Sequence, residues 1–212
     1  LGISLCKLKI SKMLKFFYIG AAGFVLFEIL SVYFIMPFPG SQQMDSLDLA
    51  YFIHSYRWYF RGIFGVMIVM GAIKAFQGKY KWIPSLVLLV ALYVIYSFNF
   101  EMSADAMFRQ PEKLTFKPQS ENLLKDSSIV IGVANNGEAK AYPIRFISYH
   151  HQVQDVIGGK SVIITYCNVC RTGRVFEPIV NDEPEQFRLV GMDHFNAMFE
   201  DATTKSWWRQ VT

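Results

Sequence analysis

Cys167 and Cys170, three residues apart, offer the most reactive chemistry in the sequence. They end a β-branched run, 161–166, which predicts a strand that delivers both thiols to a turn. Two thiols at this spacing can chelate a soft metal ion or close a small disulfide ring. The pair therefore indicates a metal-binding or redox-active site, although it does not identify a substrate.

Histidines in the same half of the chain would complete a metal site. Two thiolates with one or two imidazoles suit zinc or copper. We expect His150 as the third ligand and His151 or His194 as the fourth. Because adjacent side chains diverge, at most one of His150 and His151 should meet the cysteines. An inert disulfide, or two packed thiols, carries equal weight with the metal site.

Other catalytic chemistry has less support from the residues. Thioredoxin-like exchange normally places the cysteine pair within a βαβ pattern, which the sequence lacks. Cys167 acting as a nucleophile beside His150 would be trapped by the second thiol in an oxidising compartment. Phosphate-binding glycine loops, a GxSxG elbow and an HExxH motif are absent from the sequence.

Three long apolar segments precede residue 101, in a chain that is 52% hydrophobic and 18% charged. They are residues 16–36, 58–76 and 82–100. Each is close to the roughly 20 residues that cross a bilayer core. The third is uncharged and apolar all round, which favours a membrane span over a buried soluble helix. The second is the weakest, and its crossing has an alternative start in 49–59.

Loop charges predict the orientation of these spans. Basic loops stay on the cytoplasmic side, and the lysines that set the orientation are Lys7, Lys9, Lys12, Lys15, Lys74, Lys79 and Lys81. The N-terminus is therefore expected in the cytoplasm, and three crossings place 101–212 outside, on the periplasmic face of a bacterial cell. These lysines largely explain the net charge of +4, which reflects topology rather than nucleic-acid binding.

The spans contain three charged residues, Glu28, Arg61 and Lys74, which require a special environment. Glu28 serves either in a proton or ion path or, as we favour, as a protonated group hydrogen-bonded to a neighbouring helix. Arg61, near the start of the second span, is expected to extend its side chain to the membrane surface.

The predicted domain organisation is a cytoplasmic N-terminus (1–12), a transmembrane region (13–100), a polar linker (101–127) and a periplasmic domain (128–212). In the last part, short strands alternate with turn signals such as Asn136-Gly137. Residues 143–154 favour a short helix, and 174–180 with 186–190 are expected to form a hairpin. We therefore predict three transmembrane α-helices followed by a mainly β (α+β) antiparallel domain.

Several motifs of the soluble part occur in the order found in one protein family. They are IVIGV, AYPIRFISYHHQVQDVIGG, VIITYCNVC and NAMFEDATTKSWWRQ. On these motifs, residues 128–212 resemble the DUF3179 family. The stretches CRTGRVF and GMDHFNAMFED are similar to a membrane-anchored bacterial subgroup of that family. The resemblance implies a periplasmic domain on the bacterial inner membrane, and it implies no established activity.

The resemblance marks residues beyond the cysteines. Family motif positions fall on Tyr142, His150, Asp155, Thr165, Tyr166, Asp201, Thr204, Ser206, Trp208 and Gln210. Asp155 would orient a metal-binding histidine by a hydrogen bond, without itself binding the metal. Where the family's Glu-x-x-Asn is expected, this chain has His151 and Gln154, which adds an imidazole and removes a carboxylate base. The family pattern continues past Gln210, so the sequence looks like a piece of a longer protein.

The leading interpretation is a membrane-anchored periplasmic domain with a metal-binding or redox-active Cys/His site, holding zinc or copper if a metal is present. The alternative is a non-catalytic accessory subunit of a larger membrane complex, with a structural disulfide. Its spans would pack on partner helices through Gly62, Gly65 and Gly71. The lipid bilayer is a partner in both interpretations, and whether the chain is an enzyme stays open.

Overall fold

The protein is described by a computed structural model, with backbone for residues 2–211 and side chains for 12–211. The chain divides into two compact units, Leu1–Ser103 and Ala104–Thr212. Cys6, Lys7 and Lys9 lie outside the described side chains, so the expectations that rest on them stay predictions.

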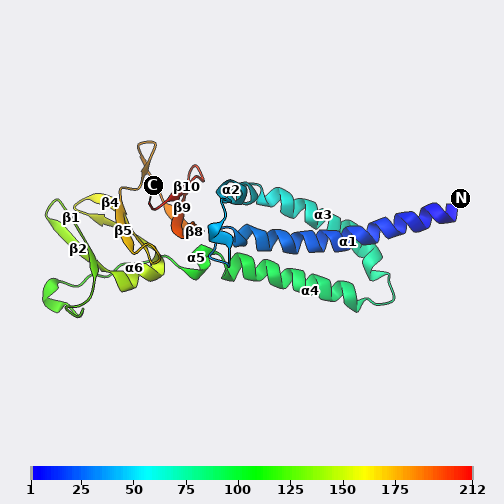
Figure 1. Cartoon of the computed structure of the whole chain (residues 1–212), viewed down its shortest axis with the longest axis horizontal. Helices are drawn as coiled ribbons and strands as arrows, with labels where there is room; N and C mark the ends of the chain where they lie inside the picture. The colour runs from blue at the N-terminus through cyan, green and yellow to red at the C-terminus, as the bar shows by residue number, and fades with distance from the viewer. Residues whose placement is uncertain (1, 212) are drawn as a thin grey trace. The chain divides into compact units, whose positions relative to one another are not determined.

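The first unit consists of long apolar helices (Figure 1). In chain order these are α1 (Gly2–Tyr33), η1 (Ser41–Gln43), α2 (Leu47–Ser55), α3 (Arg57–Phe76), α4 (Trp82–Tyr96) and the π-helical turn η2 (Ser97–Glu101). Helix α1 packs along both α3 and α4. Three stretches, Lys12–Tyr33, Arg57–Phe76 and Trp82–Glu101, are long and apolar enough to cross a membrane. The three predicted apolar helices are thus present, and membrane crossing is inferred from their length and composition alone.

The second apolar helix starts at Arg57, one residue before the predicted start at Trp58, and it does not continue back through 49–55 as the alternative required. Helix α2 ends at Ser55, and Tyr56 separates it from α3 with a backbone outside the helical region (φ −97°, ψ 11°). The approach to the span is therefore a separate short helix rather than one long tilted helix.

Arg61 does not extend away from the helices as expected. Its Nε lies 2.7 Å from Oε1 of Glu28, and its Nη2 lies 2.8 Å from Oε2. Glu28 is 1% exposed. The carboxyl group of Glu28 is thus hydrogen-bonded to a neighbouring helix, as expected, and its partner there is the Arg61 guanidinium.

Close packing between α1 and α3 depends on glycine. A side chain at Gly71 would collide with the backbone of Phe17 and Met13 on α1. By contrast, no atom lies within 4 Å of a Cβ built at Gly62 or Gly65. Gly71 therefore serves contacts inside the unit, and the expectation that it faces a partner helix is wrong.

The second unit is mainly antiparallel β-structure. Its elements are α5 (Ala104–Met107), η3 (Gln119–Glu121), β1 (Val130–Asn135), β2 (Glu138–Pro143), α6 (Ile144–His150), β3 (Gln152–Ile157), β4 (Lys160–Cys167), β5 (Thr172–Phe176), β6 (Ile179–Val180), β7 (Glu183–Pro184), β8 (Phe187–Asp193), β9 (Asn196–Asp201) and β10 (Trp207–Arg209). Strands β3-β4-β5 form one three-stranded sheet and β10-β9-β8 another, while β1-β2 and β6-β7 are two-stranded. This confirms the predicted mainly β class with antiparallel pairing.

Two details of the predicted element order differ in the structure. The helix within 143–154 ends at His150, and Gln152–Ile157 forms strand β3. His151 stops the helix because its backbone is left-handed (φ 61°), which reverses the chain. The expected hairpin of 174–180 with 186–190 forms only at its tip, where β6 pairs with β7, since β5 pairs with β4 and β8 pairs with β9.

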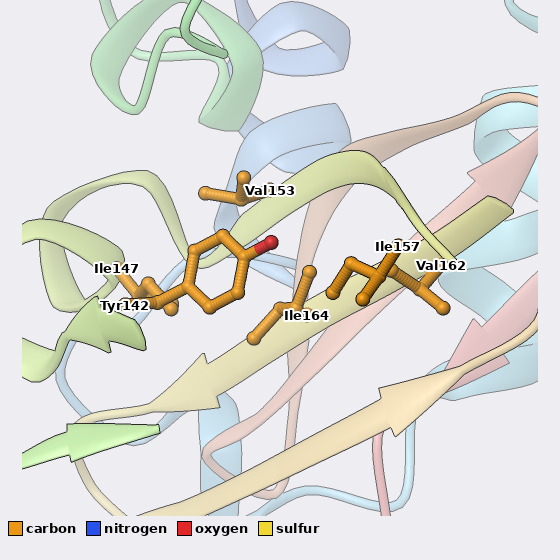
Figure 2. Packing of buried hydrophobic residues seen from close by; sticks show 6 residues of the cluster. All are labelled: Tyr142, Ile147, Val153, Ile157, Val162 and Ile164. Carbon is orange, nitrogen blue, oxygen red and sulfur yellow. The ribbon is translucent and has the colours of Figure 1, made fainter. Parts of the chain in front are cut away.

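An apolar core lies on one face of the β3-β4-β5 sheet (Figure 2). It comprises Tyr142, Ile147, Val153, Ile157, Val162 and Ile164. Figure 2 shows Ile147, Val153 and Ile164 around the Tyr142 ring, so β2, α6, β3 and β4 all contribute. Alternation along β4 directs Cys167 to the opposite face from Ile164. The cysteine pair is therefore outside this core.

Candidate functional site

The two thiols lie at the end of β4 and in the turn that follows it. Cys167 is the last residue of β4 and is 2% exposed, whereas Cys170 is exposed in the turn before β5. Both cysteines are free. The pair is 3.1 Å apart, which exceeds the S–S bond length of about 2.05 Å. The thiols are in contact but are not joined in a disulfide.

The turn between β8 and β9 forms the other side of this site. The carbonyl of Phe195 accepts hydrogen bonds from Cys167 Sγ at 3.4 Å and from Cys170 Sγ at 3.7 Å. Asn196 Nδ2 donates to Cys170 Sγ at 3.6 Å. Within the cysteine turn, the Cys170 N–H donates to Cys167 Sγ at 3.4 Å. Both thiols are therefore held toward one carbonyl from a distant part of the sequence.

Sequence reasoning missed Phe195 and Asn196. Both His194 (φ 48°) and Phe195 (φ 61°) have left-handed backbone, which closes the tight turn between β8 and β9. Nothing in the stretch GMDHFN indicated that the Phe195 carbonyl would face cysteines in another sheet. Only the packing of the two sheets brings them together.

The electrostatic environment keeps the exposed thiol protonated. The hydrogen bond with Cys167 raises the pKa of Cys170 most, and burial raises it further. The amide of Asn196 acts in the opposite direction because a donor stabilises the thiolate. Cys170 therefore has a pKa above its ordinary value and is mostly a thiol at neutral pH.

The predicted histidine ligands have other partners. His150 Nδ1 lies against the carbonyl of Arg109, and His151 Nδ1 lies 3.3 Å from the carbonyl of Tyr166. His194 Nδ1 lies 3.0 Å from Asp193 Oδ1. Burial lowers the pKa of His151, which favours a neutral ring.

The expected set of cysteine and histidine ligands is not assembled. Among the residues that the structure describes, no group of three or more His, Cys, Asp or Glu side chains could hold a metal ion. His151 is linked to the cysteine-bearing strand through its backbone, because its carbonyl accepts from the N–H of Tyr166, the neighbour of Cys167. The arrangement thus supports thiol chemistry better than metal coordination.

Asp155 does not orient a histidine as expected. Its Oδ2 accepts a hydrogen bond from the Tyr142 hydroxyl at 2.6 Å, and both of its oxygens lie 3.1 Å from Lys140 Nζ. Burial opposes ionisation, but the Tyr142 hydrogen bond contributes to a net lowering of the Asp155 pKa. Alternation along β3 places Asp155 with Val153 on the face that carries the apolar core. Asp155 is thus a polar support for the core, away from the cysteines.

The motif residues Asp201, Thr204, Ser206 and Trp208 form one hydrogen-bonded loop. The buried Asp201 carboxylate accepts from Thr204 Oγ1 at 2.6 Å, the Ser206 N–H at 3.1 Å and Trp208 Nε1 at 2.9 Å. It also accepts from the Thr204 N–H. Burial alone would raise the pKa of Asp201, but these hydrogen bonds lower it to about 2. The motif therefore shapes the β9–β10 connection.

Gln210 and Tyr166 support the cysteine-bearing strand from opposite sides. Gln210 is buried, and its Nε2 donates to Thr165 Oγ1 at 2.9 Å and to the Thr172 carbonyl at 3.1 Å. Tyr166 packs against the apolar core on the other face. Gln210 thus ties the chain after β10 to the two strands that flank the cysteine turn.

Comparison with known proteins identifies the class of this domain. Residues 109–212 match the family described as "Protein of unknown function (DUF3179)". No curated protein and no solved structure matches the chain significantly. The described β-structure with its free cysteine pair is therefore a DUF3179 domain, preceded in the chain by three helices that could span a membrane.

Proposed function

We propose that this DUF3179 domain is a thiol–disulfide exchange module, in which Cys167 and Cys170 alternate between a dithiol and a disulfide. The observation that carries the proposal is the contact between two free thiols at 3.1 Å. Closing it to a disulfide needs the sulfurs to approach by only about 1 Å. One thiol is exposed for attack and the other is buried behind it.

The substrate class is a disulfide, R–S–S–R′. Cys170, as thiolate, attacks one substrate sulfur, and R′–S⁻ leaves and takes a proton. Cys167 then loses its proton and attacks the Cys170 sulfur of the mixed disulfide, which releases R–S⁻. The cysteine pair loses two electrons and two protons, and the substrate gains them as two thiols. The reverse sequence regenerates the dithiol from a substrate dithiol.

The direction of exchange follows from the environment of Cys170. A stabilised thiolate makes a couple oxidising, because it favours the reduced state. The pKa of Cys170 is instead raised, chiefly by its hydrogen bond with Cys167. We therefore expect a reducing couple, with a potential closer to about −270 mV than to about −120 mV.

The membrane helices would hold this chemistry at a bilayer. The lysines before the first span and between the second and third favour a cytoplasmic N-terminus. That orientation puts the domain on the periplasmic side of a bacterial inner membrane, where disulfides form and persist. An exchange module there would act on disulfides of extracytoplasmic proteins.

The experiment is a redox titration of the full chain in detergent, with Cys6→Ser as the parent. Free thiols are counted in buffers that cover a series of ratios of oxidised to reduced glutathione. Bound metal is measured on the same sample. We expect two thiols to disappear together as one two-electron step, and substitution of either cysteine by serine to abolish it. Independent alkylation of the two thiols without disulfide formation at any ratio, or one bound metal ion per chain, would contradict the proposal.

A second candidate function is that of an accessory subunit whose helices bind other membrane proteins. The observation that favours it is the open surface at Gly62 and Gly65 on α3. The structural disulfide expected with that function is not formed, so in that case the cysteines are two packed thiols that do not take part in exchange. The same titration separates the two functions, because packed thiols that do not exchange show no joint two-electron step in the glutathione buffers.

A further inference from the structure

The apolar helices contain one closed ring of polar side chains. Glu28 of α1 accepts two hydrogen bonds from the Arg61 guanidinium of α3, at 2.7 and 2.8 Å. Asn99 of η2 donates to Glu28 Oε2 at 2.8 Å and accepts from Arg61 Nη2 at 2.6 Å. Each of the three groups therefore contacts the other two, and both oxygens of the carboxylate have partners.

All three residues lie at the same end of the helical unit. Glu28 is in the second turn before the end of α1 at Tyr33, and Arg61 is in the second turn of α3, which starts at Arg57. Asn99 lies in the π-helical turn that ends the third apolar stretch. Because successive helices run in opposite directions, these positions coincide in depth. The ring therefore ties the end of α1 to the start of α3 and the end of α4.

The π-helical turn positions Asn99 for this contact. Its Nδ2 donates to the Ile95 carbonyl at 2.8 Å as well as to Glu28. A π-helical turn inserts one residue into the helix and rotates the residues after it about the helix axis. With this extra residue in the turn, the Asn99 amide faces the ion pair of Glu28 and Arg61 instead of lipid.

The charge balance explains why the three residues occur together. A lone charged side chain in a bilayer is costly, whereas a bidentate, hydrogen-bonded pair compensates much of that cost. Arg61 also packs over the Trp58 ring, 4.9 Å from its centroid. Helix α3 is the weakest of the three predicted spans, and the charge of its Arg61 is neutralised only by contact with Glu28 of α1.

We propose that Glu28, Arg61 and Asn99 form an interlock that lets α3 cross the membrane and fixes it to α1 and α4. This inference is independent of thiol exchange. It assigns Glu28 to assembly of the spans rather than to a proton or ion path, because its carboxylate is already committed to Arg61 and Asn99.

The test is a double-mutant cycle in full-length protein, with membrane topology and thermal stability in detergent as readouts. Glu28→Leu leaves Arg61 unpaired, and we expect the ratio of mis-inserted to inserted protein to rise on the order of 100-fold. Arg61→Leu combined with Glu28→Leu should restore insertion, because no buried charge remains. Asn99→Leu should have a smaller effect, since the ion pair persists.

Glu101→Leu is the matched control, because it removes an exposed acidic residue from the same turn. It should leave topology and stability unchanged. The interlock is refuted if Glu28→Leu inserts and melts like the parent protein, or if the double variant is as defective as Glu28→Leu. Normal assembly of Glu28→Gln with loss of a transport activity would instead assign the carboxylate to an ion path.

Discussion

The side-chain amide of Asn196 donates a hydrogen bond to the sulfur of Cys170 across 3.6 Å, and so joins the β8–β9 turn to the cysteine turn. Asn196 is itself fixed, because its Oδ1 accepts from the Val211 N–H at 3.2 Å. A donor aimed at sulfur stabilises the thiolate. Asn196 is therefore the one residue in direct contact with Cys170 that lowers its pKa against the combined effects of Cys167 and burial.

Replacing Asn196 by alanine should make Cys170 a weaker nucleophile. Loss of a hydrogen bond to a charged sulfur raises the pKa of Cys170 further, so the thiolate fraction at neutral pH should fall by about tenfold. The rate of iodoacetamide labelling of Cys170 measures this directly. Asn168→Ala is the control, since its amide donates to the Ser148 carbonyl at 2.8 Å instead. Equal labelling rates in the two variants would contradict the role of Asn196.

Removing the buried thiol should have the opposite effect. The hydrogen bond with Cys167 is the largest cause of the raised pKa of Cys170. In Cys167→Ala the pKa should therefore fall, and labelling of Cys170 at neutral pH should accelerate about three- to tenfold. A labelling profile between about pH 6 and pH 11 locates the midpoint. A slower rate at neutral pH would show that Cys167 assists, rather than suppresses, ionisation of Cys170.

Asp201→Asn should destabilise the domain, because an amide cannot accept all the hydrogen bonds that converge on the carboxylate. The expected loss of unfolding free energy is about 3 kcal/mol. It should be measured by urea unfolding of the full chain in detergent. Asp182→Asn, at the exposed tip of the β6–β7 turn, is the control and should be neutral.

The lowered pKa of Asp201 predicts that the folded domain loses stability at acidic pH. The pKa of Asp201 falls from an ordinary value of 3.8 to about 2 in the folded domain. Its stabilisation is therefore complete above the unfolded value and is lost as the pH falls from there through about 2. The parent protein should lose stability over this range more steeply than Asp201→Asn does.

Gly71→Leu should disrupt the helical unit, since a side chain there meets the backbone of α1 at Phe17 and Met13. Two packed backbones cannot separate without losing the rest of the α1–α3 interface, so a large fall in detergent melting temperature is expected. Gly65→Leu is the matched control, because its surroundings are open. If Gly65→Leu keeps its melting temperature but loses co-purifying membrane proteins, the accessory-subunit function gains direct support.

Secondary structure was largely predictable where local chemistry dominates. The apolar runs formed three long helices, as their length and composition predicted. Asn136-Gly137 formed the β1–β2 turn because both residues accept a positive φ (48° and 80°). The strand after His151 was missed. A histidine in left-handed conformation ends α6 there, and such a stop is rare enough for non-glycine residues that the sequence gives no warning.

What the sequence by itself determined is therefore the class of each half, the family and the identity of the reactive pair. The surroundings of that pair were decided only by tertiary structure. Phe195 lies 25 and 28 residues from the two cysteines, and it reaches them because the β8–β9 turn packs beside the end of β4. Likewise, Glu28 finds Arg61 and Asn99 33 and 71 residues away. Such contacts depend on how separate elements pack, which spacing along the chain does not encode.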